Sequence, residues 1–189
     1  MIQFTDLEPS LRALEEGGLI LYPTDTVWSI GCDATNADAV ARLKALRQLP
    51  EGHPLVILVA DMDMLKAHAG FVHPRVETLL AHHQRPLTMV FDEGVGLPQE
   101  ALGADGSVAL RITKDPFCLQ MIHEFGKPIV ATAACIGAGP IPTHFGEVSS
   151  AVIENVDYVV RHRQMDKQME EPSVIARLND DEELDFIRE

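Results

Sequence analysis

The chain has 189 residues and a formal net charge of −14, from 15 basic and 29 acidic side chains. Its hydrophobic fraction of 46% and charged fraction of 23% are ordinary for a globular protein, which excludes wholesale disorder. The acidic charge disfavours broad attraction to nucleic acid, because that attraction comes from Lys and Arg. No apolar run approaches the about 20 residues that a membrane span needs.

Helical patterns and short apolar runs alternate along the chain. Leu7, Leu11 and Leu14 recur at helical spacing and stop at a Gly-Gly pair, which predicts a first helix. The continuous apolar run at residues 55–59 is typical of a strand buried on both faces. The complete set of predicted elements, in chain order, is helix 7–14, strand 19–22, helix 39–46, strand 55–59, helices 62–68 and 74–83, strands 87–91 and 108–112, helix 115–125, strand 129–131, helix 147–155, and strands 158–160, 174–177 and 184–187.

This interleaving predicts an α/β fold in which a mixed sheet is covered by helices, within one domain over residues 1–189. The turn-rich residues 92–106 and 163–172 are expected as surface loops, and 179–183 as a solvated acidic segment. The three cysteines are an odd number without a CxxC pair, which favours buried reduced thiols over disulfides or a zinc site. The first residues lack the basic start and apolar stretch of a signal peptide, so we expect a cytoplasmic protein.

One segment concentrates polar groups directly after a buried strand. Residues 22–34 read YPTDTVWSIGCDA and place two hydroxyls and a carboxylate there, at Thr24, Asp25 and Thr26. Open α/β sheets bind ligands at the ends of their strands. An ordinary turn capped by Thr and Asp has the same composition, so the segment alone leaves both interpretations open.

Together with later blocks, this segment resembles the threonylcarbamoyl-AMP synthase family, the YrdC and YciO proteins. The later blocks follow in the family's order over nearly the whole chain: LRQLPEGHPL at 46–55, PLTMV at 86–90, SVALRI at 107–112, PIVATAAC at 128–135, EPSVI at 171–175 and FIR at 186–188. The resemblance implies a three-layer α/β domain with a strongly twisted mixed β-sheet flanked by helices.

The resemblance also implies a reaction and a site. Family members take L-threonine, bicarbonate and ATP with Mg, and they make threonylcarbamoyl-adenylate and pyrophosphate for the t6A modification of tRNA. On the L-threonine side the matching positions are Thr24, Arg111, Ala131 and Ser173. On the nucleotide side they are Arg47, Ser107, Ala133, Cys135 and Arg188. No residue is assigned a catalytic role, and no metal ligand is expected.

The chain departs from the family at the triphosphate ligands. Where the family carries K-x-R and S-x-N, this chain has Arg47, Leu49, Ala133 and Cys135. Leu49 cannot neutralise a phosphate, and the small residues donate no hydrogen bond apart from a weak S–H. The RQLP sequence is similar to the YciO branch. We therefore expect a weakened or changed synthase activity.

Two further functional hypotheses remain open from the sequence. The first is a double-stranded RNA-binding protein, which needs no triphosphate chemistry but is disfavoured by the net charge. The second is a nucleotide-binding or amino-acid-binding paralogue without catalysis. Trp28 could stack on a base or close the core, and we favour the core. Cys135 lacks a Cys-His spacing that would support a nucleophile.

Overall fold

The structure is a computed structural model that describes residues 4–167, 171–179 and 181–188. Its α-helices are α1 (Leu7–Glu15), α2 (Ala37–Arg47), α3 (Met62–His68), α4 (Pro74–His82), α5 (Pro116–Phe125) and α6 (Ser150–Ile153). Two short 3₁₀ turns, η1 (Gln99–Ala101) and η2 (Phe145–Glu147), lie in loops. Within the described residues, no helix is both long and apolar enough to cross a membrane.

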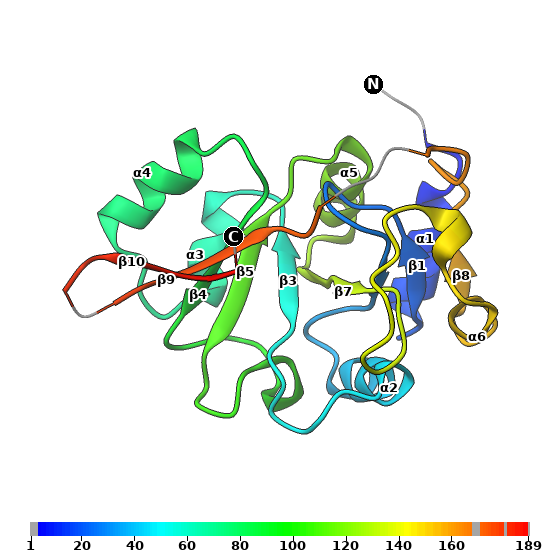
Figure 1. Ribbon diagram of the computed structural model, residues 1–189, viewed down its shortest axis with the longest axis horizontal. Coiled ribbons are helices and arrows are strands. Elements are labelled where there is room, and N and C mark those ends of the chain that lie inside the picture. The colour runs from blue at the N-terminus through cyan, green and yellow to red at the C-terminus, as the bar shows by residue number, and fades with distance from the viewer. Residues whose placement is uncertain (1–3, 168–170, 180, 189) are drawn as a thin grey trace.

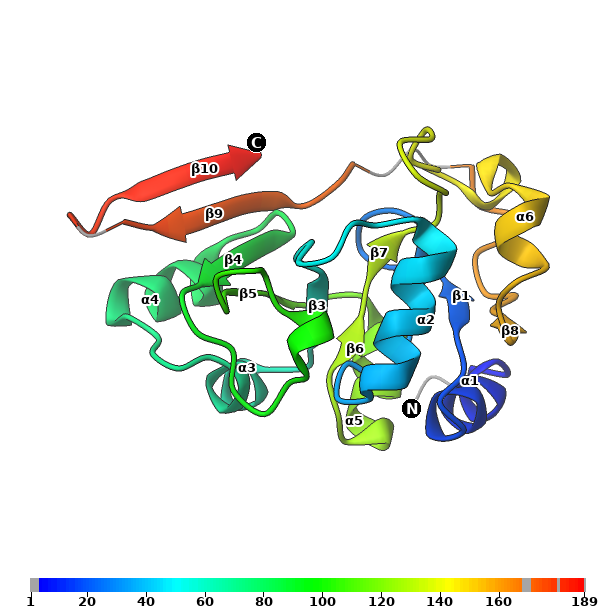
Figure 2. The same cartoon turned by 90° about the horizontal axis from the view of Figure 1, so that it is seen from below.

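The strands form two mixed sheets, which confirms the predicted α/β class. The four-stranded sheet has the order β7 (Thr132–Ala133), β2 (Ser29–Gly31), β1 (Ile20–Tyr22), β8 (Tyr158–Val159). The six-stranded sheet has the order β10 (Leu184–Arg188), β9 (Val174–Leu178), β4 (Leu87–Phe91), β5 (Val108–Ile112), β3 (Val56–Val59), β6 (Ile129–Val130). In Figure 1 the six-stranded sheet lies in the left half with α3 and α4, and the four-stranded sheet lies in the right half with α1, α2 and α6. Figure 2 shows the same two halves from below.

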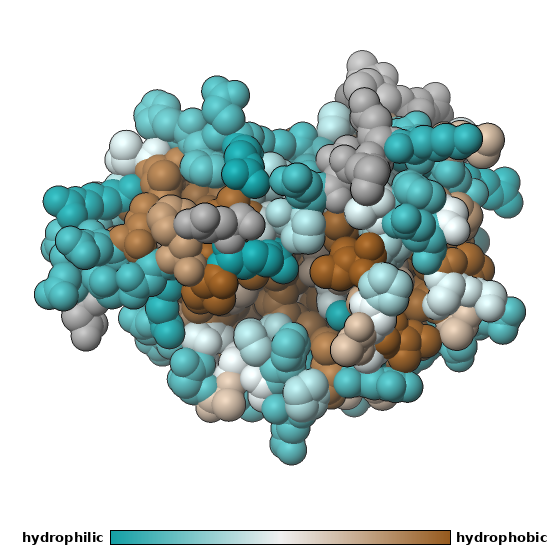
Figure 3. Space-filling view, in the orientation of Figure 1, coloured by the Kyte–Doolittle hydropathy of each residue, from teal (hydrophilic) through white to brown (hydrophobic). Residues whose placement is uncertain are grey.

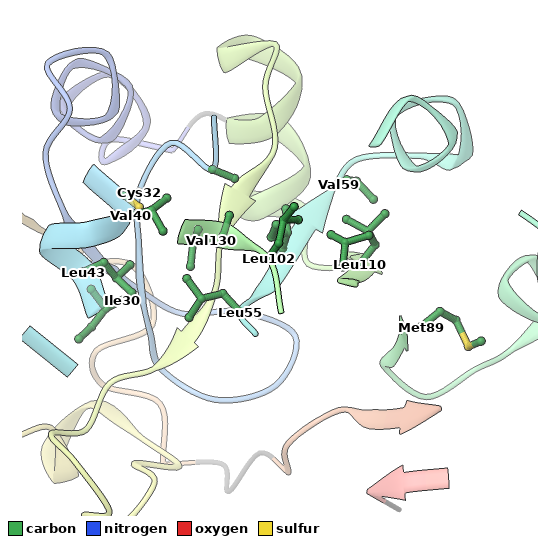
Figure 4. Close-up of a cluster of buried hydrophobic side chains, with 14 of the residues drawn as sticks. Ile30, Cys32, Val40, Leu43, Leu55, Val59, Met89, Leu102, Leu110 and Val130 are labelled. Carbon is green, nitrogen blue, oxygen red and sulfur yellow. The ribbon is translucent and has the colours of Figure 1, made fainter. Parts of the chain in front are cut away.

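The apolar runs of β1 and β3 are explained by two hydrophobic clusters on opposite faces of these strands. Leu21 and Ile57 belong to one cluster, whereas their chain neighbours Tyr22 and Leu58 belong to the other. Because successive side chains of a strand point to opposite faces, both faces of these strands must be apolar. Figure 4 shows the first cluster, to which α2, β2, β3 and β5 contribute side chains.

Local capping signals set the ends of the helices. The side chains of Asn36, Asp61 and Asp115 each accept a backbone N–H in the first turn of α2, α3 and α5. These bonds satisfy donors that a helix leaves free at its start. The α5 helix ends at Gly126, whose positive φ of 72° is the left-handed conformation that glycine adopts without strain.

The structure differs from the sequence-based expectation at the junction of the two sheets. The expected strand 129–131 stops at Val130, and after Ala131 the chain continues as β7 in the other sheet. The strands β2 and β7 were not predicted, because two or three residues give too little periodicity to detect. The predicted helix 147–155 is shorter, with η2 and the four-residue α6 in its place.

The expected loops are mostly confirmed. Residues 92–106 form a loop that contains η1, and 163–167 and 171–172 lie outside regular structure, whereas 168–170 fall outside the described residues. Of the expected acidic segment, residues 179 and 181–183 lie between β9 and β10, where Glu182 pairs with Arg75 at 3.3 Å, whereas residue 180 falls outside the described residues. Cys32, Cys118 and Cys135 are buried free thiols.

A buried carboxylate attaches the N-terminal segment to the strand at the far edge of the four-stranded sheet. Asp6 is only 4% exposed. Its carboxylate accepts hydrogen bonds from the Tyr158 hydroxyl at 2.6 Å and from the backbone N–H groups of Arg161 and His162, both at 3.0 Å. Burial, followed by the hydrogen bond to Asp6, raises the pKa of Tyr158 to about 12.

We expect Asp6→Ala to lower the free energy of unfolding by about 2–3 kcal/mol, because it leaves a hydroxyl and two backbone donors without their acceptor. Urea denaturation followed by circular dichroism measures the change. Glu8→Ala is the matched control, since the Glu8 side chain is 87% exposed and its ion pair with Arg12 lies at the surface. Equal losses for the two variants would contradict this role of Asp6.

Candidate functional site

A cleft of about 500 Å³ lies between the two sheets. One wall comes from the four-stranded sheet, through Ser29 of β2 and Thr132 and Ala133 of β7. The other wall comes from the six-stranded sheet, whose strands β3, β4, β5, β9 and β10 all contribute side chains. The chain crosses between the walls at Ala131, which also lines the cleft. In Figure 3 the surface is hollowed near its middle, with brown apolar residues among teal hydrophilic ones.

The cleft is cationic, although the protein is strongly acidic. Its lining residues include the four arginines Arg47, Arg111, Arg177 and Arg188 and the histidine His53, and among the described residues that line it there is no Asp or Glu. Val56, Val90 and Ile175 make part of the lining apolar. A pocket of this size with an apolar surface and converging cations suits a small anionic ligand with an apolar part.

Arg111 is the most deeply buried of these cations. It lies on β5 with 4% of its side chain exposed, and its Nη2 is 3.2 Å from Oδ1 of Asp25, which is 10% exposed. The two groups form an ion pair but are not aligned as a hydrogen bond, so Arg111 Nε and Nη2 have no hydrogen-bond partner. Buried donors without a partner are uncommon in native proteins. This arrangement makes Arg111 a natural fork for a ligand carboxylate or phosphate.

Ser173 and Arg188 lie together at the β9–β10 side of the cleft. The Ser173 hydroxyl is 2.8 Å from the Thr88 hydroxyl and accepts a bond from Arg188 Nη2 at 3.3 Å. The Ser173 carbonyl accepts Arg188 Nε at 3.0 Å. Burial, and secondarily the charge of Arg111, lowers the pKa of Arg188 below its usual value. The two guanidinium groups therefore lie close enough to repel each other.

Thr24 lies beneath the cleft surface and not on it. It is 1% exposed, and its hydroxyl donates to Val27 O at 3.0 Å and accepts the Thr26 N–H at 3.0 Å. These bonds shape the turn between β1 and β2, whereas Thr26 lines the cleft. The structure confirms the turn, whose hydroxyl bonds present Thr26 to the cleft, and the ligand-binding interpretation stays a prediction. Thr24 lines instead a much smaller cavity of about 10 Å³.

Arg47 lines the cleft, but most of its guanidinium is hydrogen-bonded within the protein. It ends α2 with 8% exposure, and its Nε donates to the Thr132 hydroxyl at 3.1 Å. Its Nη1 donates to the carbonyl of Cys135 and lies 3.0 Å from the Cys135 sulfur. Arg47 thus fastens the chain after β7 to the end of α2. Cys135 itself is 7% exposed and does not line the cleft.

Of the remaining positions that the sequence singled out, some line the cleft and others pack in the hydrophobic core. Ser107 and Ala133 line the cleft. The hydroxyl and N–H of Ser107 bond Asp105 and hold the pKa of that carboxyl below its usual value, so the hydroxyl is already partly engaged. Leu49 is partly buried against the hydrophobic core. Trp28 is 4% exposed and packs on Phe145 with ring centroids 5.0 Å apart, which confirms that it belongs to the core.

Sequence reasoning missed His53 and Arg177 as lining residues. His53 follows Gly52 in the loop after α2, and burial together with the nearby charges of Lys44 and Arg47 lowers its pKa below 6.5. Arg177 alternates with Ala176 on β9, and only one of these two positions is apolar and buried. That alternation is the sequence signal that could have placed Arg177 on the face of β9 opposite to the one that buries Ala176.

The structure is therefore a mixed α/β protein whose two sheets enclose a cleft of a size and charge that suit a small anionic ligand. A sequence model of the Sua5/YciO/YrdC family, described as telomere recombination, matches residues 12–189. The chain belongs to this family, which confirms the resemblance.

Curated relatives of this chain include several threonylcarbamoyl-AMP synthases. The protein from Halorhodospira halophila is 36% identical over 122 residues, which cover 64% of this chain and 64% of the relative. The protein from Escherichia coli O1:K1 / APEC is 30% identical over 142 residues, which cover 74% of this chain and 75% of the relative. The alignment thus spans just under two thirds of the Halorhodospira protein's length.

Solved structures show the same fold. The crystal structure of E. coli YciO superimposes with a TM-score of 0.85 at 22% identity, covering 100% of this chain and 91% of that one. P. abyssi Sua5 complexed with L-threonine has a TM-score of 0.83 at 24% identity, covering 94% of this chain and 52% of that chain. At these identities the likeness concerns the fold alone.

Proposed function

We propose that this protein makes threonylcarbamoyl-adenylate and pyrophosphate from L-threonine, bicarbonate and MgATP, at a rate reduced by its altered triphosphate ligands. The observation that carries the proposal is the cationic cleft in a protein of net charge −14. Its relatives are named for this activity, and one neighbour in fold was solved with L-threonine. The product would feed the t6A modification of tRNA.

The chemistry requires two anionic groups to be held in one cleft. The threonine amine and bicarbonate form a carbamate with loss of water, and a carbamate oxygen then attacks the α-phosphorus while the bond to pyrophosphate breaks. Positioning and charge neutralisation dominate such a reaction. On this proposal Arg111 holds the threonine carboxylate, with Ser173 and Ala131 nearby. Arg188, Ser107 and Ala133 lie on the nucleotide side, and MgATP enters as a co-substrate.

The structure gives a physical reason for expecting reduced activity. Arg47 donates Nε–H to Thr132 and Nη1–H to the Cys135 carbonyl, so at most Nη2 is left to bind a phosphate. Leu49 packs against the core, and the small side chain of Ala133 offers the cleft no donor. Leaving-group charge is stabilised by preorganised donors and cations, and this cleft offers fewer of them.

Threonine-dependent pyrophosphate release, measured with ATP and bicarbonate, tests the proposal. We expect slow release from the parent protein and none from Arg111→Ala. Thr24→Ala is a poorer negative control, because the Thr24 hydroxyl bonds within its own turn. Release that is no faster in the parent than in Arg111→Ala would reject the synthase activity.

The double-stranded RNA hypothesis is less well supported. Four of the arginines line a cleft of about 500 Å³, which suits a small molecule, and the net charge of −14 opposes binding to a phosphate backbone. A paralogue that binds the same ligands without catalysis would show binding of L-threonine or ATP but no pyrophosphate release.

A further inference from the structure

Asp25 is a buried carboxylate to which the proposed reaction assigns no role. It lies in the loop between β1 and β2, and its Oδ2 accepts the backbone N–H of Lys114 at 3.0 Å. Its Oδ1 is buried, makes no hydrogen bond, and lies 3.2 Å from Nη2 of Arg111. Asp25 does not line the cleft, whereas Arg111 does. The carboxylate therefore reaches Arg111 from beneath the cleft wall.

This contact joins the two walls. Asp25 belongs to the four-stranded sheet's β1–β2 loop, and Arg111 and Lys114 belong to β5 and the residues just after it. Arg188 also lies near Arg111, and the described residues lining the cleft include no acidic side chain. Asp25 therefore contacts the Arg111 guanidinium from outside the set of residues that line the cleft.

We infer that Asp25 is a positioning residue that orients the Arg111 guanidinium toward the carboxylate of the substrate amino acid. The identity of that substrate rests on the proposed function, but the Asp25–Arg111 contact does not. A guanidinium grips a carboxylate through two parallel bonds, which demand a fixed plane. The ion pair of Nη2 with Asp25 supplies that constraint before the ligand arrives, so less order has to be gained on binding.

The first arm of the experiment needs no ligand. Nitrogen-15 NMR of the Arg111 Nε–Hε group is compared between the parent and Asp25→Asn, which keeps the shape and can still accept the Lys114 N–H. We expect the Arg111 signal to broaden and its hydrogen exchange to accelerate. Asp33→Asn is the matched control, because Asp33 is also buried and ion-paired, but its partner Lys127, at 2.8 Å, does not line the cleft as Arg111 does. It should leave the Arg111 signal unchanged.

The second arm separates positioning from general loss of structure. L-threonine and L-threoninol, which lacks the carboxylate, are titrated by NMR into each protein. Asp25→Asn should lower the affinity for L-threonine by about tenfold and change the affinity for L-threoninol by less than about twofold. If Asp25→Asn does not fold, Asp25→Glu, which keeps the charge but displaces it, should show the same difference between the ligands.

The outcomes are distinguishable. An unchanged Arg111 signal in Asp25→Asn, or equal weakening of both ligands, would overturn the inference. A parent protein that binds neither ligand would reject L-threonine as the substrate, while the ligand-free comparison would still decide whether Asp25 orders Arg111.

Discussion

Arg111→Ala is expected to lower the affinity for L-threonine by about a hundredfold or more. The guanidinium is proposed to make two charged hydrogen bonds to the ligand, each worth about 1.5–3 kcal/mol. The same substitution leaves the Asp25 carboxylate buried without a counter-charge, so we expect the free energy of unfolding to fall by about 3–5 kcal/mol. Calorimetric titration and urea denaturation measure the two effects.

The double variant Arg111→Ala/Asp25→Ala separates those effects. Removing both charges should restore part of the stability, because no unpaired buried charge remains. It should not restore threonine binding, because the fork is still missing. Recovery of binding in the double variant would mean that Arg111 acts only through the fold, which would contradict its proposed contact with the ligand.

A triple variant, Leu49→Arg, Ala133→Ser and Cys135→Asn, is expected to bind ATP at least tenfold more tightly than the parent and to release pyrophosphate faster. Each lost ligand is worth about 1.5–3 kcal/mol when its hydrogen bond is charged. Leu49→Arg should contribute most, because it alone adds a full charge. Non-additivity is expected, since these groups would act on one triphosphate.

We leave Arg47→Lys out of this set, although the resemblance implies a lysine at that position in the family. Arg47 uses its fork on Thr132 and on the Cys135 carbonyl, and a lysine cannot reproduce both contacts. Leu49→Gln in place of Leu49→Arg is the matched control, because it adds polarity without charge. A folded triple variant with unchanged ATP affinity would show that the divergence extends beyond these positions.

Much of the fold could be predicted from neighbours in the sequence. The helices α3 and α5 and the strands β4 and β5 begin and end close to where apolar spacing and capping residues place them. Such signals involve only a few neighbouring residues, so they can be recognised without knowing how the rest of the chain folds. The strands β2 and β7 were not predicted because each has only two or three residues and because their mutual pairing joins distant parts of the chain.

The candidate site was predicted as a set of positions but not as a geometry. The family motifs correctly brought Arg111, Ser173 and Arg188 to one cleft, and they could not show that the Thr24 hydroxyl would turn inward while Thr26 faces the cleft. Side-chain direction within a turn depends on which backbone groups the turn leaves to be satisfied. No spacing rule contains that information.

The amino-acid sequence was enough to establish the α/β class and the family, because each depends on residue type and order. The tertiary structure was needed to show two contacts. Arg47, at the end of α2, bonds the chain after β7, and Asp25, in the β1–β2 loop, lies against Arg111 of β5. An arginine side chain has several rotatable bonds, and its guanidinium has five N–H donors. Its hydrogen-bond partners are therefore the groups that distant parts of the chain bring within reach. Those partners decide whether an arginine is free for a ligand, and they are set only when the two sheets pack together.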